Sequence, residues 1–415
     1  MLNTKRLHLV LALTIAFLSF TSQDALAAKP LKVYILAGQS NMEGHAEIRT
    51  IGYAGDDAET AHLLEMMTDA NGDPVVADRA WVSNLNGFFD NNGVKTGKLA
   101  AGFGARRNPT ELGNKVGPEY TFGLTMQAAY DGPILIIKTA WGGKSLHTDF
   151  RSPSAGPYTL SDWQKENYPK QEGHGIPKDF AQWKLDKAKA TGVYYKMMIE
   201  HVNAVLADPG KVVPNYDKEA GYEVAGFVWF QAWNDWVDSH TYPHNLGEKR
   251  FDAYSTFMSH FINDVRKEVK APDMPFVIGV MGVDGPVAPD AKNQSMNHFR
   301  KAMAAPSKTM KHVYAVETAP MWDKKLGEID RNRNKVRQMA YFLKVKHKDH
   351  ANADGSMSDA DQKAYLKKYE EKMIPLGDQA IWARGASNAG YHYMGSGKMI
   401  AQFGEAFAKA LLEAE

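Results

Sequence analysis

The stretch Lys32-Val33-Tyr34-Ile35-Leu36, followed by Gly38-Gln39-Ser40-Asn41-Met42, decides the fold of this chain. Its first part is a short apolar run with β-branched and aromatic side chains, which predicts a buried strand. A serine directly after such a strand lies at the carboxyl edge of an open α/β sheet, where ligands bind. Gly38 permits a sharp turn there, and the amides of Gln39 and Asn41 can position a hydroxyl group or a substrate. Ser40 is therefore a candidate nucleophile, although a plain turn that contains a serine also fits the spacing.

Further apolar runs follow at wide intervals and predict four more strands. Their apolarity is near-continuous rather than alternating, which is typical of strands buried on both faces of a parallel sheet. Helix-like patterns lie between and after the runs, and this alternation predicts an α/β fold with right-handed crossovers. After residues 33–36, the predicted strands span 134–137, 224–230, 276–283 and 313–316, and the predicted helices span 194–206, 251–269, 332–347 and 396–412.

The fold class expected from this order is α/β, a three-layer α/β/α sandwich with a mainly parallel sheet and long elaborated loops. The loops are residues 43–125 and 144–192, which are rich in Gly, Pro, Asn and Trp and are expected over the carboxyl edge of the sheet. No linker divides residues 28–415, so we expect them to form a single domain.

The first 27 residues have the pattern of a secretory signal peptide. Lys5 and Arg6 precede an apolar run from Leu7 to Phe20, and Ala25-Leu26-Ala27 forms an A-x-A cleavage site. The apolar run is short for a membrane span, so we expect no membrane anchor and export to the periplasm or the outside of the cell.

Charge and cysteine content exclude several classes of function. Removal of Lys5, Arg6 and Asp24 with the signal peptide leaves 47 Lys plus Arg against 47 Asp plus Glu. A neutral chain without a basic run gives no electrostatic reason to expect a nucleic-acid partner. The chain has no cysteine, which excludes thiol catalysis and thiolate metal sites. It also lacks an H-E-x-x-H motif and a compact His/carboxylate cluster, so we expect neither a metal nor another cofactor.

Two more polar motifs follow predicted strands. Trp141-Gly142-Gly143-Lys144 comes after the second strand, and its adjacent glycines can bring backbone N–H groups close to a ligand, as an oxyanion hole requires. Gln231 and Asn234 come after the third strand and offer amide donors at the same edge. A structural Gly-Gly turn, and amides that only bind loop backbone, fit these two motifs as well.

A histidine follows in Asn388-Ala389-Gly390-Tyr391-His392, just before the last predicted helix. Its late position suits a general base that takes the proton from Ser40.

Taken in order, the four blocks resemble those of the SGNH (GDSL-type) hydrolases, most closely the sialate O-acetylesterase-like branch, related to carbohydrate acetylesterases acting on xylan. The resemblance runs from the first strand to the last helix, and its most specific block is Gly38-Gln39-Ser40-Asn41-Met42. It implies a flavodoxin-like sheet and metal-free acyl transfer. It also implies that Ser40 is the nucleophile, and that its own N–H, the Gly143 N–H and the Asn234 side chain are the oxyanion donors. His392 would then be the base.

Gly117-Pro118-Glu119 resembles another block of the same branch, in a loop that borders the crevice. A turn before the helix-like residues 122–129 fits this block equally well. Gln39 and Gln231, which flank the proposed machinery, are expected to bind substrate.

Two positions depart from the pattern of the branch. Ala232 stands where the branch usually has glycine, and Ala389 stands where the family places an Asp three residues before the histidine. The carboxylate that orients the histidine is therefore absent from its expected place. Asn388 or a backbone carbonyl would give a Ser–His dyad, whereas Glu317, just past the fifth strand, and Asp235 are the candidate substitute acids.

The function expected from the resemblance is a secreted serine esterase that removes O-acetyl groups from an acetylated polysaccharide or sialic acid through an acetyl-enzyme. The partner would be an acetylated carbohydrate. A non-catalytic carbohydrate-binding protein is the alternative, because nine tryptophans and 18 tyrosines suit stacking on sugar rings. Another exported acyl hydrolase, such as a lipase, is the third interpretation. An extended apolar site would favour it, whereas the proposed loops are polar and aromatic. The absence of G-x-S-x-G argues against an α/β-hydrolase elbow.

Overall fold

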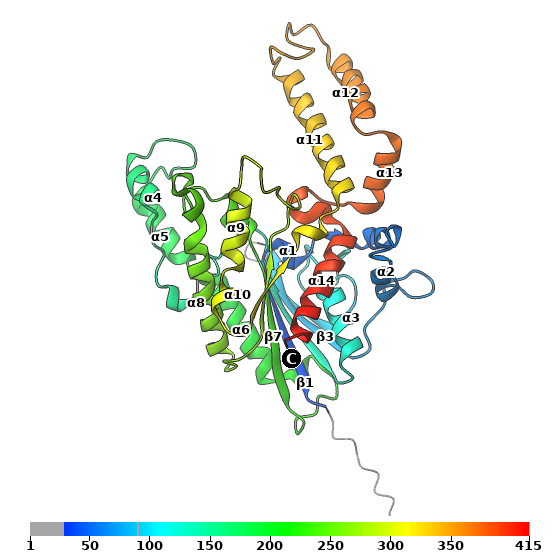
Figure 1. The fold of residues 1–415 in the computed structure, drawn as a ribbon, viewed down its shortest axis with the longest axis vertical. Helices are drawn as coiled ribbons and strands as arrows, with labels where there is room; N and C mark the ends of the chain where they lie inside the picture. Colours follow the sequence, from blue (N-terminus) through cyan, green and yellow to red (C-terminus); the bar gives the residue numbers. More distant parts are fainter. Residues whose placement is uncertain (1–28, 89–90, 415) are drawn as a thin grey trace, which may run out of the picture.

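The computed structural model describes residues 29–88 and 91–414 (Figure 1). The signal peptide predicted for residues 1–27 lies outside these residues. Within them, no helix is both long enough and apolar enough to cross a membrane.

β1 lies at the centre of a seven-stranded sheet, between β6 and β7. The strand order is β4-β3-β6-β1-β7-β8-β9, and only the β3–β4 pair is antiparallel. The strands are β1 (Leu31–Gly38), β3 (Ala80–Phe88), β4 (Asn91–Lys98), β6 (Ile134–Ala140), β7 (Tyr222–Phe230), β8 (Phe276–Val280) and β9 (Val313–Glu317), with β2 (Ala46–Glu47) and β5 (Lys115–Val116) as a separate antiparallel pair.

The five strands expected from the sequence are β1, β6, β7, β8 and β9. Numbered along the chain, they follow the order 2-1-3-4-5, which is the order of flavodoxin-like sheets. In such sheets the crevice opens where the strand order reverses, here at the carboxyl ends of β1 and β7. The β3–β4 hairpin extends this sheet at the β6 edge.

Helices cover both faces of the sheet, so the predicted three-layer α/β/α sandwich is confirmed (Figure 1). One face carries α3 and α14, and the other carries α6, α8, α9 and α10. The helices are α1 (Ser40–Glu43), α2 (Ala61–Met67), α3 (Glu119–Ala129), α4 (Asp162–Asn167), α5 (Phe180–Ala190), α6 (Val193–Ala207), α7 (Trp233–Val237), α8 (Asp252–Glu268), α9 (Ser295–Ala304), α10 (Pro306–Thr309), α11 (Lys324–Lys344), α12 (Asp359–Met373), α13 (Leu376–Gly385) and α14 (Gly397–Leu412).

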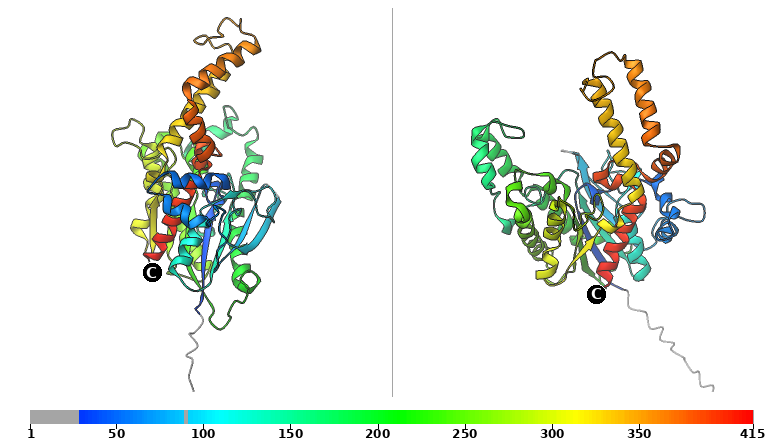
Figure 2. Two further views of the ribbon diagram at one scale, coloured as in Figure 1. Left: turned by 90° about the vertical axis from the view of Figure 1, so that its right-hand side faces the viewer. Right: turned by 45° about the horizontal axis from the view of Figure 1, so that its top comes forward.

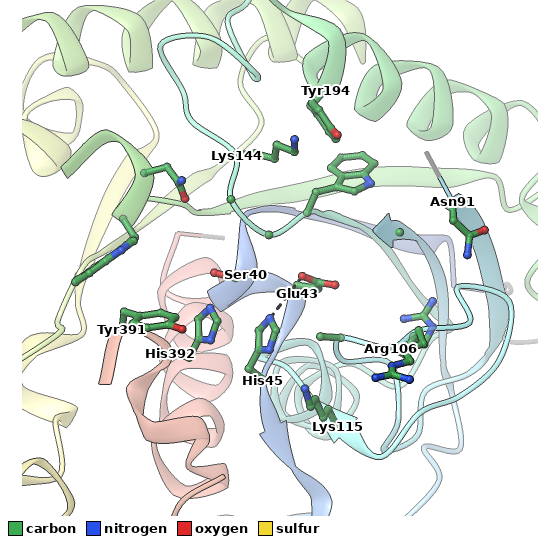
Figure 3. Close-up of a pocket in the computed structure, with 18 of the residues that line it drawn as sticks. Ser40, Glu43, His45, Asn91, Arg106, Lys115, Lys144, Tyr194, Tyr391 and His392 are labelled. Atoms are coloured by element: carbon green, nitrogen blue, oxygen red, sulfur yellow. Dashed lines mark ion pairs between the residues drawn. The ribbon is translucent and has the colours of Figure 1, made fainter. Parts of the chain in front are cut away.

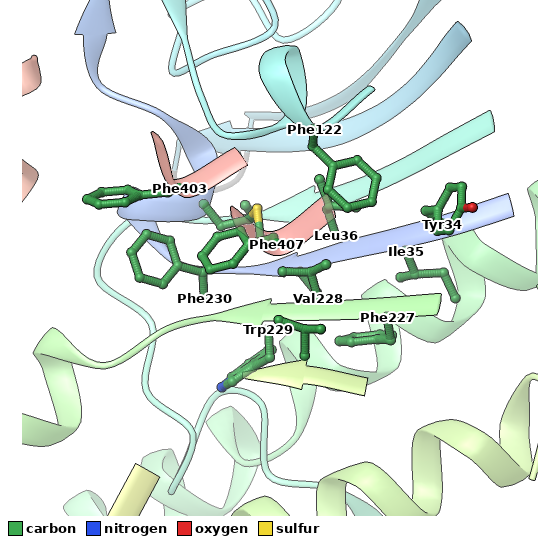
Figure 4. Packing of buried hydrophobic residues seen from close by; sticks show 14 of the residues in the cluster. Tyr34, Ile35, Leu36, Phe122, Phe227, Val228, Trp229, Phe230, Phe403 and Phe407 are labelled. Atoms are coloured by element: carbon green, nitrogen blue, oxygen red, sulfur yellow. The ribbon is translucent and has the colours of Figure 1, made fainter. Parts of the chain in front are cut away.

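Alternate residues of β7 fill the core on opposite faces of the sheet (Figure 4). Phe230 packs against Phe403 and Phe407 of α14, with ring centroids 5.5 and 5.3 Å apart. Trp229 faces the other way and packs 4.4 Å from Phe261 of α8. Burial on both faces explains why this strand is continuously apolar in the sequence.

The prediction that residues 43–125 form loops was wrong for the β3–β4 hairpin and for the helices in this stretch. β4 is an edge strand whose side chains are exposed or only partly buried, so its polar sequence lacks the apolar run by which the other strands were recognised. The stretch 144–192 likewise contains α4 and α5. α11 begins at Lys324, earlier than predicted. Its last turns lie outside the sandwich, in an arm with α12 and α13 (Figure 2).

Candidate active site

The carboxyl ends of β1, β6 and β7 and the turn before α14 meet around one cavity of about 1050 Å³. Ser40, Gly143, Asn234 and His392, which are distant in the sequence, all line it. The topology therefore brings the four residues predicted to act together to one cavity, where Figure 3 shows the side chains of Ser40 and His392.

Ser40 begins α1 at the end of β1. The turn needs a glycine at position 38 because a Cβ there would lie 2.2 Å from the carbonyl oxygen of Phe230 on the neighbouring strand. Ser40 is 6 % exposed, and its Oγ makes no hydrogen bond to any described residue. A hydroxyl without a partner at the mouth of a cavity is available to a substrate, and catalytic hydrogen bonds commonly tighten only when substrate binds.

The three proposed oxyanion donors belong to residues that line the same cavity: Ser40, Gly143 and Asn234. In the described part of the chain, the Ser40 N–H, the Gly143 N–H and the Asn234 Nδ2 donate no hydrogen bond, so all three remain free for a ligand oxygen. Gly143 has a φ of +75°, a conformation that side chains other than glycine rarely adopt. Gly142 is adjacent to the nucleophile, since a Cβ on it would lie 3.8 Å from the Ser40 Cβ.

Gln39 and Gln231 lie beneath the cavity, and neither is among the described residues that line it. Each is 1 % exposed. The Gln231 Nε2 donates to the Gln39 Oε1 at 3.2 Å and to the Lys144 carbonyl at 3.0 Å. The expected substrate contact is thus replaced by a buried network that ties the loops after β1, β6 and β7 together.

His392 lies in a strained loop that closes over α1. The two residues after it, Tyr393 and Met394, have positive φ values of 51° although neither is a glycine, and both are fully buried. The Tyr393 hydroxyl accepts a hydrogen bond from the Gly282 N–H at 2.8 Å, and the Asn41 Nδ2 donates to the Tyr391 carbonyl at 3.2 Å. Packing and hydrogen bonds therefore hold a backbone conformation that fixes the imidazole at the cavity.

Asn388 provides the acceptor for the histidine. The His392 Nδ1 lies 3.0 Å from the Asn388 Oδ1, which also accepts the Ala389 N–H at 2.8 Å. An amide oxygen can only accept a hydrogen bond, so the Nδ1 must carry the hydrogen and the Nε2 of the neutral ring is left to act as a base. This geometry matches the Ser–His dyad with a neutral acceptor.

Neither candidate acid contacts His392. Asp235 is fully buried and accepts hydrogen bonds from the Leu146 and His147 N–H groups, the Gln231 side chain and the Tyr242 hydroxyl. Glu317 is exposed at the end of β9 and is not among the described residues that line the cavity. Asp235 instead shapes the loop that follows Gly143.

Burial, and after it the charges of His45 and Lys115, together lower the pKa of His392 to about 3. The imidazole is therefore neutral, and hence able to accept a proton, at ordinary pH.

The remaining walls of the cavity are polar and aromatic, and they include residues that the motifs did not identify (Figure 3). Among the described residues, four cationic side chains and one carboxylate line it, in a chain whose overall formal charge is only +1. The Lys144 ammonium lies 4.2 Å from the centre of the Tyr194 ring. These further lining residues include Glu43, His45, Asn91, Arg106, Arg107, Asn114, Lys115, Trp141, Lys144, Tyr194, Trp233 and Tyr391.

Glu119 of the Gly117-Pro118-Glu119 block forms a buried ion pair below the cavity. The Lys138 Nζ donates to the Glu119 Oε2 at 2.6 Å, and both side chains have no exposed area. The same ammonium donates to the carbonyl oxygens of Glu43 and Phe103 at 2.8 and 3.1 Å. The pair thus anchors the end of α1, which carries Ser40, to the strand β6.

Among residues 29–88 and 91–414, no group of three or more His, Cys, Asp or Glu side chains is arranged to hold a metal ion.

The family model of carbohydrate esterases described as sialic acid-specific acetylesterases matches residues 30–327. The matched range includes Ser40, Gly143 and Asn234 and ends before His392. A solved structure of a protein from Arabidopsis thaliana is 14% identical, with 70% of this chain and 86% of that chain covered and a TM-score of 0.36. That of a novel carbohydrate acetylesterase from Xanthomonas citri is also 14% identical, with a TM-score of 0.37; the match covers 69% of this chain and 49%, about half, of the Xanthomonas protein. No curated protein sequence matches.

Proposed function

The chain belongs to the carbohydrate esterase family of sialic acid-specific acetylesterases and is a carboxylic ester hydrolase; we propose that it removes O-acetyl groups from carbohydrates through an acetyl-enzyme on Ser40. One observation carries the mechanism: a serine hydroxyl, three N–H donors and a histidine Nε2, none of which has a hydrogen-bond partner among the described residues, converge on one cavity. This is the set of groups that acyl transfer needs.

The reaction proceeds in two balanced steps. The Ser40 Oγ attacks the acetyl carbon as its proton passes to the His392 Nε2, and the carbonyl electron pair moves onto the oxygen held by Ser40, Gly143 and Asn234. Collapse of this intermediate breaks the bond to the sugar oxygen, which takes the proton from His392. Water then attacks the acetyl-enzyme as its proton passes to His392, and collapse of the second intermediate releases acetate and returns the proton to the Ser40 Oγ.

The charge of the cavity favours an acidic carbohydrate among the possible substrates. Arg106, Arg107, Lys115 and Lys144 outnumber the one carboxylate of the described lining, Glu43. Arg107 is exposed and makes no hydrogen bond or ion pair with a described residue, so its charge is available to a ligand. Sialic acid and uronic-acid polysaccharides carry the carboxylate that such a surface attracts.

Acetate release tests the proposal, with Ser40→Ala as the negative control. The substrates to compare are acetylated xylan, O-acetylated sialic acids and acetylated algal polysaccharides. We expect release that depends on Ser40 and is fastest with an acidic substrate. Arg107→Gln should raise KM for that substrate but not for p-nitrophenyl acetate. Binding of a carbohydrate without any turnover would instead support a non-catalytic carbohydrate-binding protein.

Export belongs to the same proposal. The basic, apolar and small-residue pattern of residues 1–27 supports a periplasmic or extracellular esterase that meets its polysaccharide outside the cytoplasm. Sequencing of the amino terminus of the mature protein tests this, and we expect it to begin at Ala28.

A further inference from the structure

Glu43 and His45 form a buried pair beside His392 that the steps above do not use (Figure 3). The His45 Nε2 lies 3.6 Å from the Glu43 Oε2, and the two side chains are 18% and 10% exposed. The face of the His45 ring stacks on the His392 ring, with centroids 4.0 Å apart and an interplanar angle of 5°. His45 therefore contacts both the Glu43 carboxylate and the His392 imidazole.

The start of α1 places Glu43 near the reacting atoms. Glu43 follows Ser40 by three residues in this helix, a spacing that puts two side chains on one helical face. A Cβ on Gly142 would lie 3.4 Å from the Glu43 Oε2 and 3.8 Å from the Ser40 Cβ, so the carboxylate and the nucleophile flank the same glycine. Among the described residues that line the cavity, Glu43 is the only carboxylate.

The environment of His392 otherwise opposes the charge that the reaction creates. Burial disfavours the imidazolium, and the positive charges of His45 and then of Lys115 disfavour it further. Asn388, which accepts the hydrogen bond from Nδ1, is neutral, and Ala389 carries no charge at the position where the family has the orienting carboxylate. An anion near the ring is therefore needed to stabilise the positive charge of the imidazolium that forms when His392 takes the proton from Ser40.

We propose that Glu43 supplies negative charge that offsets the positive charges of His45 and Lys115 and so stabilises the His392 imidazolium, in place of the missing triad carboxylate. His45 is the positioning residue: its ring fixes the plane of His392 by stacking, and its Nε2 holds the carboxylate nearby. The protons move only between Ser40, His392, the sugar oxygen and the attacking water, as described under the proposed function, on which this inference rests.

Glu43→Gln tests the proposal because it removes the charge and keeps the shape. An opposite charge near an ionisable group shifts its pKa by one to three units, so we expect kcat to fall on the order of 10–100-fold with KM little changed. The acidic limb of kcat/KM should move to lower pH, because His392 becomes a weaker base. The titratable groups that face His392 are His45, Lys115 and Tyr391, with Glu43 beyond His45.

Asn388→Asp in the Glu43→Gln background provides the rescue. This isosteric change places a carboxylate opposite the His392 Nδ1. It breaks no hydrogen bond donated by the Asn388 Nδ2, because that atom donates none to a described residue. We expect the double variant to recover most of the lost kcat and to return the acidic limb to higher pH. A purely structural role of Glu43 would leave both unrestored.

Three results would overturn the inference. The first is a Glu43→Gln variant with unchanged kcat and pH profile. The second is a fall in kcat of Glu43→Gln that Asn388→Asp does not recover, although thermal unfolding shows that the double variant is folded. The third is a His45→Gln variant as inactive as His392→Ala, which would make His45 the base. Failure of the proposed function itself is distinguishable, because the unmodified protein would then release no acetate.

Discussion

Replacement of Glu119 by glutamine is expected to lower the free energy of unfolding by about 3–5 kcal/mol, the cost of leaving one partner of a buried ion pair without the other. The Lys138 ammonium and the Glu119 carboxylate are 2.6 Å apart with no exposed area. Burial already lowers the pKa of Lys138, and Glu119 opposes that shift. Without the carboxylate, Lys138 either stays charged and uncompensated or loses its proton, and a neutral amine has one donor fewer for its three acceptors.

Urea unfolding followed by tryptophan fluorescence measures this cost, and Asp162→Asn is the control. Asp162 accepts from Lys165 at 2.8 Å, but this pair is exposed, so its loss should change the unfolding midpoint little. Glu119→Gln should also lower kcat, because Lys138 holds the Glu43 carbonyl at the end of α1. A Glu119→Gln variant that loses less than about 1 kcal/mol would refute the reasoning that this pair anchors the site.

Three further predictions concern the catalytic groups. Asn234→Ala should lower kcat on the order of 10²–10³-fold with little change in KM, and an effect on KM alone would make Asn234 a substrate-binding residue. Glu317→Gln and Asp235→Asn should both leave the pH profile of activity unchanged. Asp235→Asn should lower the free energy of unfolding by about 1–3 kcal/mol, because it alters a buried acceptor of several hydrogen bonds. If either variant lost about 10⁴ in kcat while it remained folded, that residue would be the orienting acid. Because the pKa of His392 is lowered to about 3, the base stays neutral as pH falls below 6.5, the ordinary histidine value, and kcat/KM should hold well below it; an acidic limb centred near pH 6.5 would contradict this.

The strands that position the site are predictable from the sequence because they are buried on both faces. β1, β6 and β7 each give an apolar run, and the turn after each carries a residue that lines the cavity: Ser40, Gly143 and Asn234. β4 is not predictable in this way, since it is an edge strand with exposed, polar residues. α12 is similar: none of its residues is buried, so no apolar stripe marks it.

The chemical environment of the histidine could be predicted only in part. Asn388 was identifiable as an acceptor because it precedes His392 by four residues, although the turn that brings them together depends on two residues with positive φ. Glu43 and His45 lie within five residues of Ser40, and the helical spacing from Ser40 to Glu43 is the signal that could have found the carboxylate. The stacking of His45 on His392 joins segments almost 350 residues apart and has no local signature.

The most direct test of the esterase mechanism is whether Ser40 itself carries the acetyl group. Turnover of p-nitrophenyl acetate, stopped by acid within the first catalytic cycle and analysed by peptide mass spectrometry, answers this. We predict one added acetyl group on the peptide that contains Ser40, absent from Ser40→Ala, whose kcat should fall by several orders of magnitude while the protein remains folded. Near-normal turnover by Ser40→Ala, or an acetyl group on another residue, would contradict the mechanism.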